Sequence, residues 1–288
     1  MKRNGDTEWQ QSLLRRYPAA SVGGFPSYAP EVLEGLEPDG YDPRAHAELA
    51  NLEADNWWFR SRNALIVEAV GRWFPDAPTY LEIGCGTGFV LRGLTEAFPD
   101  MAMVGSELFL TGLAETQSRL PNATLIQMDA RHMPFREEFS LVGAYDVIEH
   151  IEEDLKVLTN IHGALRPGGG LILTVPQHEW LWSLADEQAH HVRRYTRSRL
   201  HSVVRSAGYE ILWSRSFVSL LTPLMLLSRR AGSDEARQRD PYIDFRIKPS
   251  VNRTLERVSS IERSMVRHGV RFPVGGSRIL VARKAPST

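Results

Sequence analysis

Short apolar segments alternate with amphipathic segments between Thr79 and Val175, and this alternation limits the folds that the chain can adopt. We expect strands at 79–83, 101–105, 123–127, 141–145 and 171–175. The segments between several of them, 89–98, 110–119 and 152–165, have the apolar spacing of helices. Strands that alternate with helices form a parallel sheet covered on both faces. The sequence therefore predicts an α/β fold with a doubly wound sheet.

The flanking regions extend this prediction to seven strands and a helical cap. Segments 209–215 and 277–283 are predicted strands, and 216–270 is mostly helical. Residues 1–45 are rich in proline and glycine, which favours an extended arm with short turns, and a helical pattern follows up to Phe74. We divide the chain into an N-terminal arm and helical lid (1–75), a Rossmann-like ligand-binding domain (76–216 and 275–288) and a helical insertion that caps the substrate (217–274).

Composition excludes several classes of protein. The chain has 288 residues, a formal net charge of −1 and a single cysteine, Cys85, so it forms no internal disulfide or multi-cysteine metal site. The balanced charge argues against a nucleic-acid partner. No leader or apolar span of roughly 20 residues is visible, so we expect a cytoplasmic protein without stable membrane insertion. Arginine supplies most of the basic residues, which indicates GC-rich coding and a bacterial source.

The strongest motif is the glycine-rich stretch Leu81–Gly88, which ends the first predicted strand and opens a helix. Glycines here allow a tight turn and close approach of a ligand to the backbone. A dinucleotide fingerprint would need a third glycine where Phe89 stands, and no Lys-Ser/Thr pair follows as in a phosphate loop. The carboxylate of Glu82 would repel a pyrophosphate but suits a cationic amine, such as that of S-adenosylmethionine.

This stretch resembles the first motif of class I S-adenosylmethionine-dependent methyltransferases, and motifs at the ends of later strands continue the resemblance. The branch is that of bacterial small-molecule enzymes, similar to ubiquinone- and menaquinone-type methyltransferases. In this family an acid after the second strand binds the ribose hydroxyls, and an aspartate after the third meets the adenine amine. The resemblance implies these cofactor-binding residues: Glu82, Gly84, Cys85, Gly86, Gly88, Glu107, Leu108, Asp129, Ala130 and Asp146.

The loops after the fourth and fifth strands are expected to face the methyl group. Methyl transfer to oxygen or nitrogen needs alignment and often a base, for which histidine is suited. The catalytic candidates are His150, His191 and Glu149, and the substrate-binding candidates are Trp58, His190, Arg194 and Tyr195. Capping and loop packing are an alternative role for Glu149 and His150.

Three features leave alternatives open. Asp146, Glu149 and His150 could hold a divalent metal, as the similar residues of the ubiquinone O-methyltransferase can, although we do not favour a metal. Arg60 and Arg62, beside three consecutive aromatic residues, could reach the cofactor carboxylate or lie in solvent. The basic residues Arg193, Arg194, Arg197 and Arg199 could attract an anionic acceptor or simply be a solvated helix start.

The sequence thus indicates an S-adenosylmethionine-dependent methyltransferase acting on an oxygen or nitrogen, or a carbon, of a small molecule. The apolar insertion and aromatic lid favour a partly hydrophobic acceptor from secondary-metabolite, quinone or lipid-linked biosynthesis. The alternative is a regulatory protein that binds S-adenosylmethionine without catalysis. A homodimer is compatible with either function.

Overall fold

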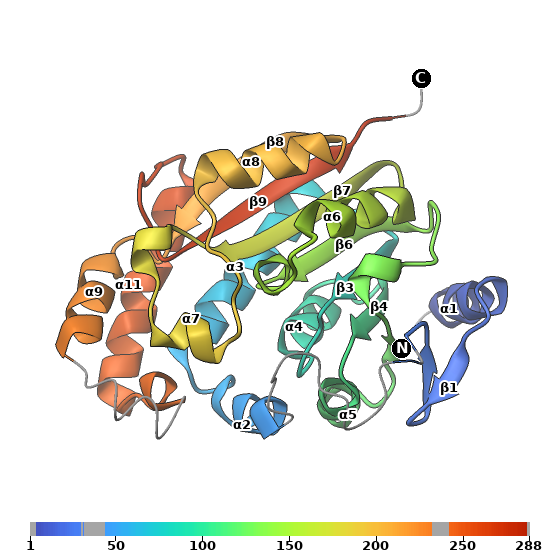
Figure 1. Cartoon of the computed structure of the whole chain (residues 1–288), viewed down its shortest axis with the longest axis horizontal. Coiled ribbons are helices and arrows are strands. Elements are labelled where there is room, and N and C mark those ends of the chain that lie inside the picture. The colour runs from blue at the N-terminus through green and yellow to red at the C-terminus, as the bar shows by residue number, and fades with distance from the viewer. Residues whose placement is uncertain (1–3, 30, 32–43, 232–241, 287–288) are drawn as a thin grey trace.

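The computed structural model describes residues 4–29, 31, 44–231 and 242–286, and Figure 1 shows a single twisted sheet with helices on both faces. Within these residues the sheet has nine strands in the order β1-β2-β5-β4-β3-β6-β7-β9-β8. The strands are β1 (Ala20–Val22), β2 (Phe25–Ser27), β3 (Thr79–Ile83), β4 (Ala102–Glu107), β5 (Thr124–Gln127), β6 (Phe139–Tyr145), β7 (Leu165–Pro176), β8 (Tyr209–Phe217) and β9 (Ser277–Lys284).

The helices alternate with these strands. The α-helices are α1 (Asn4–Arg16), α2 (Arg44–Leu52), α3 (Trp57–Trp73), α4 (Phe89–Ala97), α5 (Leu110–Arg119), α6 (Asp154–Ala164), α7 (Leu184–Gln188), α8 (Arg197–Ser206), α9 (Thr222–Ala231) and α11 (Pro249–Arg267). Single 3₁₀ turns are η2 (Ala130–His132), η3 (Ile148–His150), η4 (Glu179–Leu181) and η5 (Ile243–Phe245). Strands β2 to β7 run parallel where they pair, whereas β9 runs antiparallel to both β7 and β8. The predicted doubly wound α/β fold is confirmed.

Alternate residues of the central strand pack into two separate cores. Leu81 of β3 joins the core beneath α1, α6 and α8, whereas its neighbour Tyr80 joins the core beneath α3, α4 and α5. Successive side chains of a strand point to opposite faces, so a strand buried on both sides reads as a continuous apolar run. This explains why the central strands were visible in the sequence.

The N-terminal region differs from the predicted extended arm. Residues 4–16 form α1, which buries Leu13 and lets the Gln10 amide donate to the Met103 carbonyl (2.7 Å). The hairpin β1–β2 then joins the sheet edge through Ser27 opposite Gln127. The sheet therefore has two strands more than the seven predicted. These strands have three residues each, with Gly23 and Gly24 in the turn between them and Pro26 in β2, so they depend on tertiary pairing. Residues 32–43 of the predicted arm lie outside the described residues.

The single helical pattern predicted up to Phe74 is two helices, α2 and α3. Asn56 separates them, because its side-chain oxygen accepts from the Trp58 N–H (2.8 Å) and caps α3. Its amide nitrogen also donates to the Phe245 carbonyl (2.9 Å), so the cap of α3 is tied to the helical insertion. The break positions α2 independently of α3.

Helix α11 of the insertion packs against α3 (Figure 1). The ion pairs Arg60–Glu256 and Arg263–Glu68 join the two helices. Of the predicted insertion, 232–241 lies outside the described residues. None of the helices in the described part of the chain has the length and apolar character required to span a bilayer.

Candidate functional site

The glycine loop connects β3 to α4 at the carboxyl edge of the parallel strands. Gly84 and Gly86 have positive φ angles of 63° and 52°, a region that favours glycine. A Cβ on Gly84 would lie 2.6 Å from the Val147 side chain, whereas one on Gly86 would have no atom within 4 Å. Gly84 is therefore required for packing against the neighbouring strand exit, and Gly86 leaves open space beside the loop.

Glu107 at the end of β4 is bonded to this loop. Its Oε2 accepts from the Gly86 N–H (2.9 Å), and its Oε1 accepts from the N–H groups of Leu108 (2.8 Å) and Phe109 (3.2 Å). The carboxylate is buried but retains lone pairs, because an ionised carboxylate has about four acceptor positions. It can therefore accept further hydrogen bonds from a ligand in the open space at Gly86.

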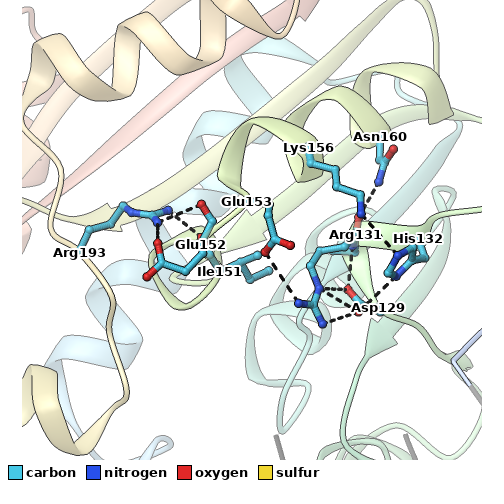
Figure 2. Close-up of polar contacts among 10 residues, drawn as sticks. Asp129, Arg131, His132, Ile151, Glu152, Glu153, Lys156, Asn160 and Arg193 are labelled. Atoms are coloured by element: carbon cyan, nitrogen blue, oxygen red, sulfur yellow. Dashed lines mark hydrogen bonds and ion pairs between the residues drawn. The ribbon is translucent and has the colours of Figure 1, made fainter. Parts of the chain in front are cut away.

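Asp129, after β5, is held by a neighbouring arginine (Figure 2). Its side chain accepts from the Arg131 N–H (2.8 Å) and pairs with the Arg131 guanidinium (2.8 Å). Burial opposes the charge of Asp129, but the bonds from Arg131 outweigh it and hold the pKa of Asp129 below its usual value. The aspartate is therefore ionised and fixed at the strand end.

Glu82 lies within β3 and is buried without a full counter-charge. Burial raises the pKa of its carboxyl to about 8, although Arg62 and the Tyr80 hydroxyl act in the opposite direction. The Tyr80 hydroxyl lies 3.3 Å from Glu82 Oε2. A cation placed beside this carboxyl would stabilise its ionised form.

We call the glycine loop together with Glu82, Glu107 and Asp129 the cofactor edge. Arg62 of α3 lies between this edge and the lid. Its guanidinium pairs with the Asp146 carboxylate at the exit of β6 and lies 4.5 Å from the ring centroid of Trp58. The arginine also lines a cavity of about 20 Å³, which has space for roughly one water. Trp58, Phe217 and Val218 supply apolar side chains to the lining of this cavity.

Glu149, in η3 after β6, has a different environment. Glu149 is fully buried, and neither of its carboxyl oxygens has a hydrogen-bond partner among the described residues. Burial and the nearby charge of Asp146 raise the pKa of Glu149 well above its usual value. Burial therefore favours the protonated, neutral form of this carboxyl, and a cation bound beside it would favour the ionised form.

His191 is oriented by a buried acid. Its Nδ1 lies 2.8 Å from Asp186 Oδ1, and Asp186 is itself bound by Arg194 Nε at 2.7 Å. The His150 and His191 ring centroids are 4.7 Å apart, so the exits of β6 and β7 meet at this point. His150 remains exposed, but the surrounding protein and His191 lower the pKa of its imidazole.

Glu149, His150 and His191 each offer one ligand atom, and these atoms lie within 4.8 Å of one another. Asp146, which the sequence analysis placed in the metal set, is not in this group because it pairs with Arg62. The three-residue group could hold a cation, with His191 contributing the nitrogen that does not face Asp186.

Comparison with known protein families identifies the family to which the chain belongs. The model of a family described as "Methyltransferase domain" matches residues 38–213, more than half of the chain. This chain belongs to the methyltransferase domain family. The resemblance predicted from the glycine loop and the later strand ends is thereby confirmed.

Curated relatives of this methyltransferase domain act on different small molecules, as their names state. It is 25% identical over 205 residues to a ubiquinone biosynthesis O-methyltransferase of Pseudomonas paraeruginosa, covering 58% of this chain and 84% of that protein. It is 28% identical over 121 residues to a trans-aconitate 2-methyltransferase of Azoarcus sp., covering 42% and 46%. The chain spans about a third to a half of the length of the first curated relatives that it matches.

Solved structures share the fold. A phosphoethanolamine N-methyltransferase 2 of Haemonchus contortus, in complex with phosphomonomethylethanolamine and S-adenosylhomocysteine, has a TM-score of 0.55 at 18% identity, covering 85% of this chain and 58% of that one. A [4+2]-cyclase has a TM-score of 0.50 at 21% identity, covering 77% and 81%. One fold thus accommodates methyl transfer and an unrelated reaction, so the reaction must be inferred from the residues of the site and not from the fold.

The methyltransferase domain places most predicted residues at the exits of the five parallel strands β3 to β7, but three of them face elsewhere. Tyr195 is fully buried in the core and its hydroxyl donates to Asp154 (2.7 Å), so its prediction as a substrate contact is wrong. Cys85 and Ala130 are buried in the two cores, with the Cys85 thiol 3.8 Å from the Thr116 hydroxyl. Burial raises the pKa of Cys85 well above its usual value, which leaves it protonated.

Other predicted residues have partners that define their roles. Arg194 is buried and binds Asp186, so it helps to hold the carboxylate that orients His191. His190 is exposed beside His191, and Trp58 lies at the cavity wall. Gly88 begins α4 in a left-handed conformation with φ 74°.

The sequence analysis missed two buried acids. Glu53, after α2, accepts from the Thr87 hydroxyl of the glycine loop and pairs with Arg119 (2.9 Å), which ties the lid to the loop. Asp186 orients His191. No local pattern distinguishes Glu53 from a surface residue, because its partners are 34 and 66 positions away in the chain. Asp186 does carry a local signal, since it forms a capping box with Ser183, and its partners His191 and Arg194 are five and eight positions away.

Proposed function

We propose that this methyltransferase domain transfers the methyl group of S-adenosylmethionine to an oxygen or nitrogen of a small, partly hydrophobic acceptor. The observation that carries the proposal is the Asp186–His191 pair, which lies beside Glu149 and His150 at the edge that also carries the glycine loop. A histidine held by a buried carboxylate is suited to removing a proton.

The residues of the cofactor edge fit S-adenosylmethionine. Glu82 would attract its ammonium group, Glu107 would accept from its ribose hydroxyls, and the open side of Gly86 would admit its body. Arg62, now paired with Asp146, would be within the same region as its carboxylate. When bound, S-adenosylmethionine supplies an electrophilic methyl group on a sulfonium.

The acceptor would lie between the lid and the exits of β6 and β7. His191 donates from Nδ1 to Asp186, so Nε2 keeps a lone pair and takes the proton of the acceptor hydroxyl or amine. As the new carbon–oxygen or carbon–nitrogen bond forms, the carbon–sulfur bond breaks and S-adenosylhomocysteine leaves. Trp58, Phe217 and Val218 at the cavity favour an acceptor with an apolar body.

The cavity between α3 and α11 is too small for such an acceptor, at about 20 Å³. Binding therefore requires α3 and the insertion to separate locally. The ion pairs Arg60–Glu256 and Arg263–Glu68 across this contact are partly exposed, so their exchange for water costs little.

The test is incubation with methyl-labelled S-adenosylmethionine and a panel of quinol, polyketide, organic-acid and amino-sugar acceptors. We expect label in one acceptor class, and loss of that label in His191→Ala with cofactor affinity retained. Asp186→Asn should lower turnover less, because it changes the tautomer of His191 but leaves the ring in place. Tight cofactor binding with no labelled acceptor from any class would favour the non-catalytic alternative.

A further inference from the structure

Two buried tyrosines have their hydroxyl groups close to the Glu82 carboxyl. Tyr80 of β3 and Tyr145 of β6 both lie in the core beneath α3, α4 and α5. Tyr80 Oη lies 3.3 Å from Glu82 Oε2 and 3.2 Å from Tyr145 Oη. The three groups therefore form a continuous polar chain within a layer of apolar side chains. We call Glu82, Tyr80 and Tyr145 the tyrosine chain.

The strand geometry explains how these three side chains meet. Tyr80 and Glu82 are two positions apart in β3, so their side chains point to the same face of the sheet. The neighbouring strand β6 runs parallel to β3 and places Gly143 beside Glu82 (Figure 1). Tyr145 is two positions after Gly143, so its side chain shares this face.

Gly143 provides the space in which the two hydroxyls meet. A Cβ at this position would lie 2.4 Å from Tyr145 Oη and 2.5 Å from Tyr80 Oη. Both distances are far shorter than a non-bonded contact allows, so even an alanine would displace the two rings. The absence of a side chain at Gly143 is therefore required for the tyrosine chain to form.

Tyr80 is the hydrogen-bond donor to the Glu82 carboxyl, which forms no ion pair within the described part of the chain. Two charged side chains act on this carboxyl from other elements. Arg62 of α3 favours its ionisation, and Glu107 of β4 opposes it. Arg62 is itself bound to the Asp146 carboxylate. The Tyr80 hydroxyl is therefore the group that orients the Glu82 carboxyl.

The hydroxyls of the tyrosine chain can supply protons to hydrogen bonds but carry no charge. Burial raises the pKa of Tyr80, Tyr145 and the nearby Cys85 above their usual values, so all three stay protonated at neutral pH. A hydroxyl has one proton, and a hydrogen bond to an ionised acceptor is stronger than one to a neutral oxygen. When Glu82 is ionised, Tyr80 therefore donates to the carboxylate, and the Tyr80 oxygen accepts from Tyr145.

Packing alone does not explain the two hydroxyls. The buried Tyr209, in the core on the opposite face of the sheet, donates to the Leu158 carbonyl (3.2 Å), so its hydroxyl satisfies a backbone group. The hydroxyls of Tyr80 and Tyr145 bond to each other and to Glu82 instead. Removing a hydroxyl from water costs free energy unless a hydrogen bond compensates. The Glu82 carboxyl is the group that these hydroxyls serve.

We propose that Tyr80 and Tyr145 are positioning residues that orient the Glu82 carboxylate towards the ammonium group of S-adenosylmethionine. The inference rests on the proposed cofactor role of Glu82. An ionised carboxylate has about four acceptor positions, so the ammonium group and the Tyr80 hydroxyl can bind it together. Hydrogen bonds to the charged form of an acid favour that form, so the tyrosine chain also helps Glu82 to ionise when the cofactor binds.

The test is calorimetric titration of the full chain between about pH 6 and 8.5. One ligand is S-adenosylhomocysteine, which has the ammonium group, and the other is 5′-methylthioadenosine, which lacks it. We expect Tyr80→Phe to bind S-adenosylhomocysteine about 3- to 10-fold more weakly at pH 7.5, and 5′-methylthioadenosine as the parent does. The rise of S-adenosylhomocysteine affinity with pH should move to higher pH in this variant, because a bond that favours the carboxylate is lost.

Three further variants separate positioning from packing. Tyr145→Phe should weaken S-adenosylhomocysteine binding about 2- to 3-fold, because Tyr145 acts through Tyr80. Tyr209→Phe is the matched control, since it removes a buried hydroxyl from the other core, and it should bind both ligands as the parent does. In Glu82→Gln, the addition of Tyr80→Phe should cause less than about a twofold further loss, because the carboxylate that Tyr80 orients is gone.

The outcomes distinguish this inference from the proposed role of Glu82. If Glu82→Gln weakens S-adenosylhomocysteine binding and Tyr80→Phe does not, the positioning role is overturned and the role of Glu82 stands. If neither variant weakens binding, the role of Glu82 fails and the inference fails with it. Equal losses for both ligands, or a full further loss in Glu82→Gln, would show that Tyr80 acts on the fold and would also overturn the proposal. If Tyr80→Phe does not fold, Tyr145→Phe with the same two ligands decides.

Discussion

Two glutamates at the strand exits on either side of β3, Glu107 at the end of β4 and Glu149 after β6, have opposite environments. Glu107 accepts from three backbone N–H groups, whereas Glu149 is fully buried with no partner among the described residues. Backbone donors are part of the fold, so the Glu107 carboxyl is held in position before any ligand arrives. Glu149 is left as a buried acid whose state depends on what binds beside it. We call Glu149, His150 and His191 the acceptor edge. The fold therefore fixes the side chains of the cofactor edge before a ligand binds, whereas the buried Glu149 of the acceptor edge gains a partner only when a ligand binds.

The backbone shows the same difference. At the glycine loop the positive φ angles belong to glycines, which adopt them at little cost. At the acceptor edge they belong to Asp146, His178 and His190, with φ between 54° and 64°. Such residues store strain that is common at functional sites. The following predictions test whether the two edges act separately.

The largest expected effect is at Gly86. We expect Gly86→Val to weaken binding of S-adenosylhomocysteine roughly a hundredfold or more, because the side chain would fill the open space and strain the backbone by about 1–3 kcal/mol. Calorimetric titration measures the affinity. Gly168→Val is the control, since Gly168 also has a positive φ (75°) with no atom near its would-be Cβ but lies in the turn of β7. Similar affinities for Gly86→Val and the parent would contradict the cofactor site.

At the acceptor edge, His191→Ala should reduce kcat about 10²- to 10⁴-fold, the range for loss of a general base. The affinity for S-adenosylmethionine should stay within about twofold, because the cofactor edge is built from other strands. Steady-state kinetics and titration together separate the two quantities. His268→Ala, an exposed histidine at the end of α11, serves as the control. Parallel loss of affinity and turnover would show that the edges are not independent.

Glu82 links stability to pH. Its carboxyl has a pKa of about 8 in the folded protein and about 4.3 when unfolded, so the folded state holds the proton between these values. Its contribution to stability therefore falls as pH rises from about 4.5 to 8. We expect Glu82→Gln to melt at a higher temperature than the parent at pH 7.5, with the difference vanishing near pH 4.5.

The same substitution should weaken the cofactor site. Loss of a carboxylate–ammonium contact is worth about 1.5–3 kcal/mol, so Glu82→Gln should bind S-adenosylmethionine about 10- to 150-fold less tightly. In the parent, affinity should rise with pH towards 8 as Glu82 ionises, and Glu82→Gln should lack this rise. Glu96→Gln, on the exposed side of α4, controls for net charge. If the affinity of the parent for S-adenosylmethionine did not change with pH, the proposed role of Glu82 would be refuted.

The smallest effect is expected from metal removal. We expect EDTA to change turnover by less than about twofold, because Glu149, His150 and His191 provide only three ligand atoms and Mg²⁺ prefers six oxygen-rich ligands. Assays with EDTA and with added Mg²⁺ measure this. A loss of activity that Mg²⁺ restores would instead assign a cation to this group and remove His191 as the base.

The sequence predicted the central strands and helices better than the packing of single side chains. The strand 79–83 and the helix 110–119 have the predicted bounds, because local apolar spacing defines them. The sequence named histidines and acids in the loops after β6 and β7 as candidates, but the predicted substrate contact of Tyr195 was wrong. Its burial depends on packing against residues that are far away in the chain. The predicted acceptor class and the homodimer stay predictions.

By itself, the sequence determined the alternation of strands and helices from β3 to β7 and the glycine loop, since these follow from periodicity and backbone freedom over a few residues. Only the tertiary structure decided which charges meet. Asp186 faces His191, and Glu53 closes on the glycine loop. The physical reason is that the energy of a charge depends on its burial and on partners from other elements, and neither is encoded in its local sequence.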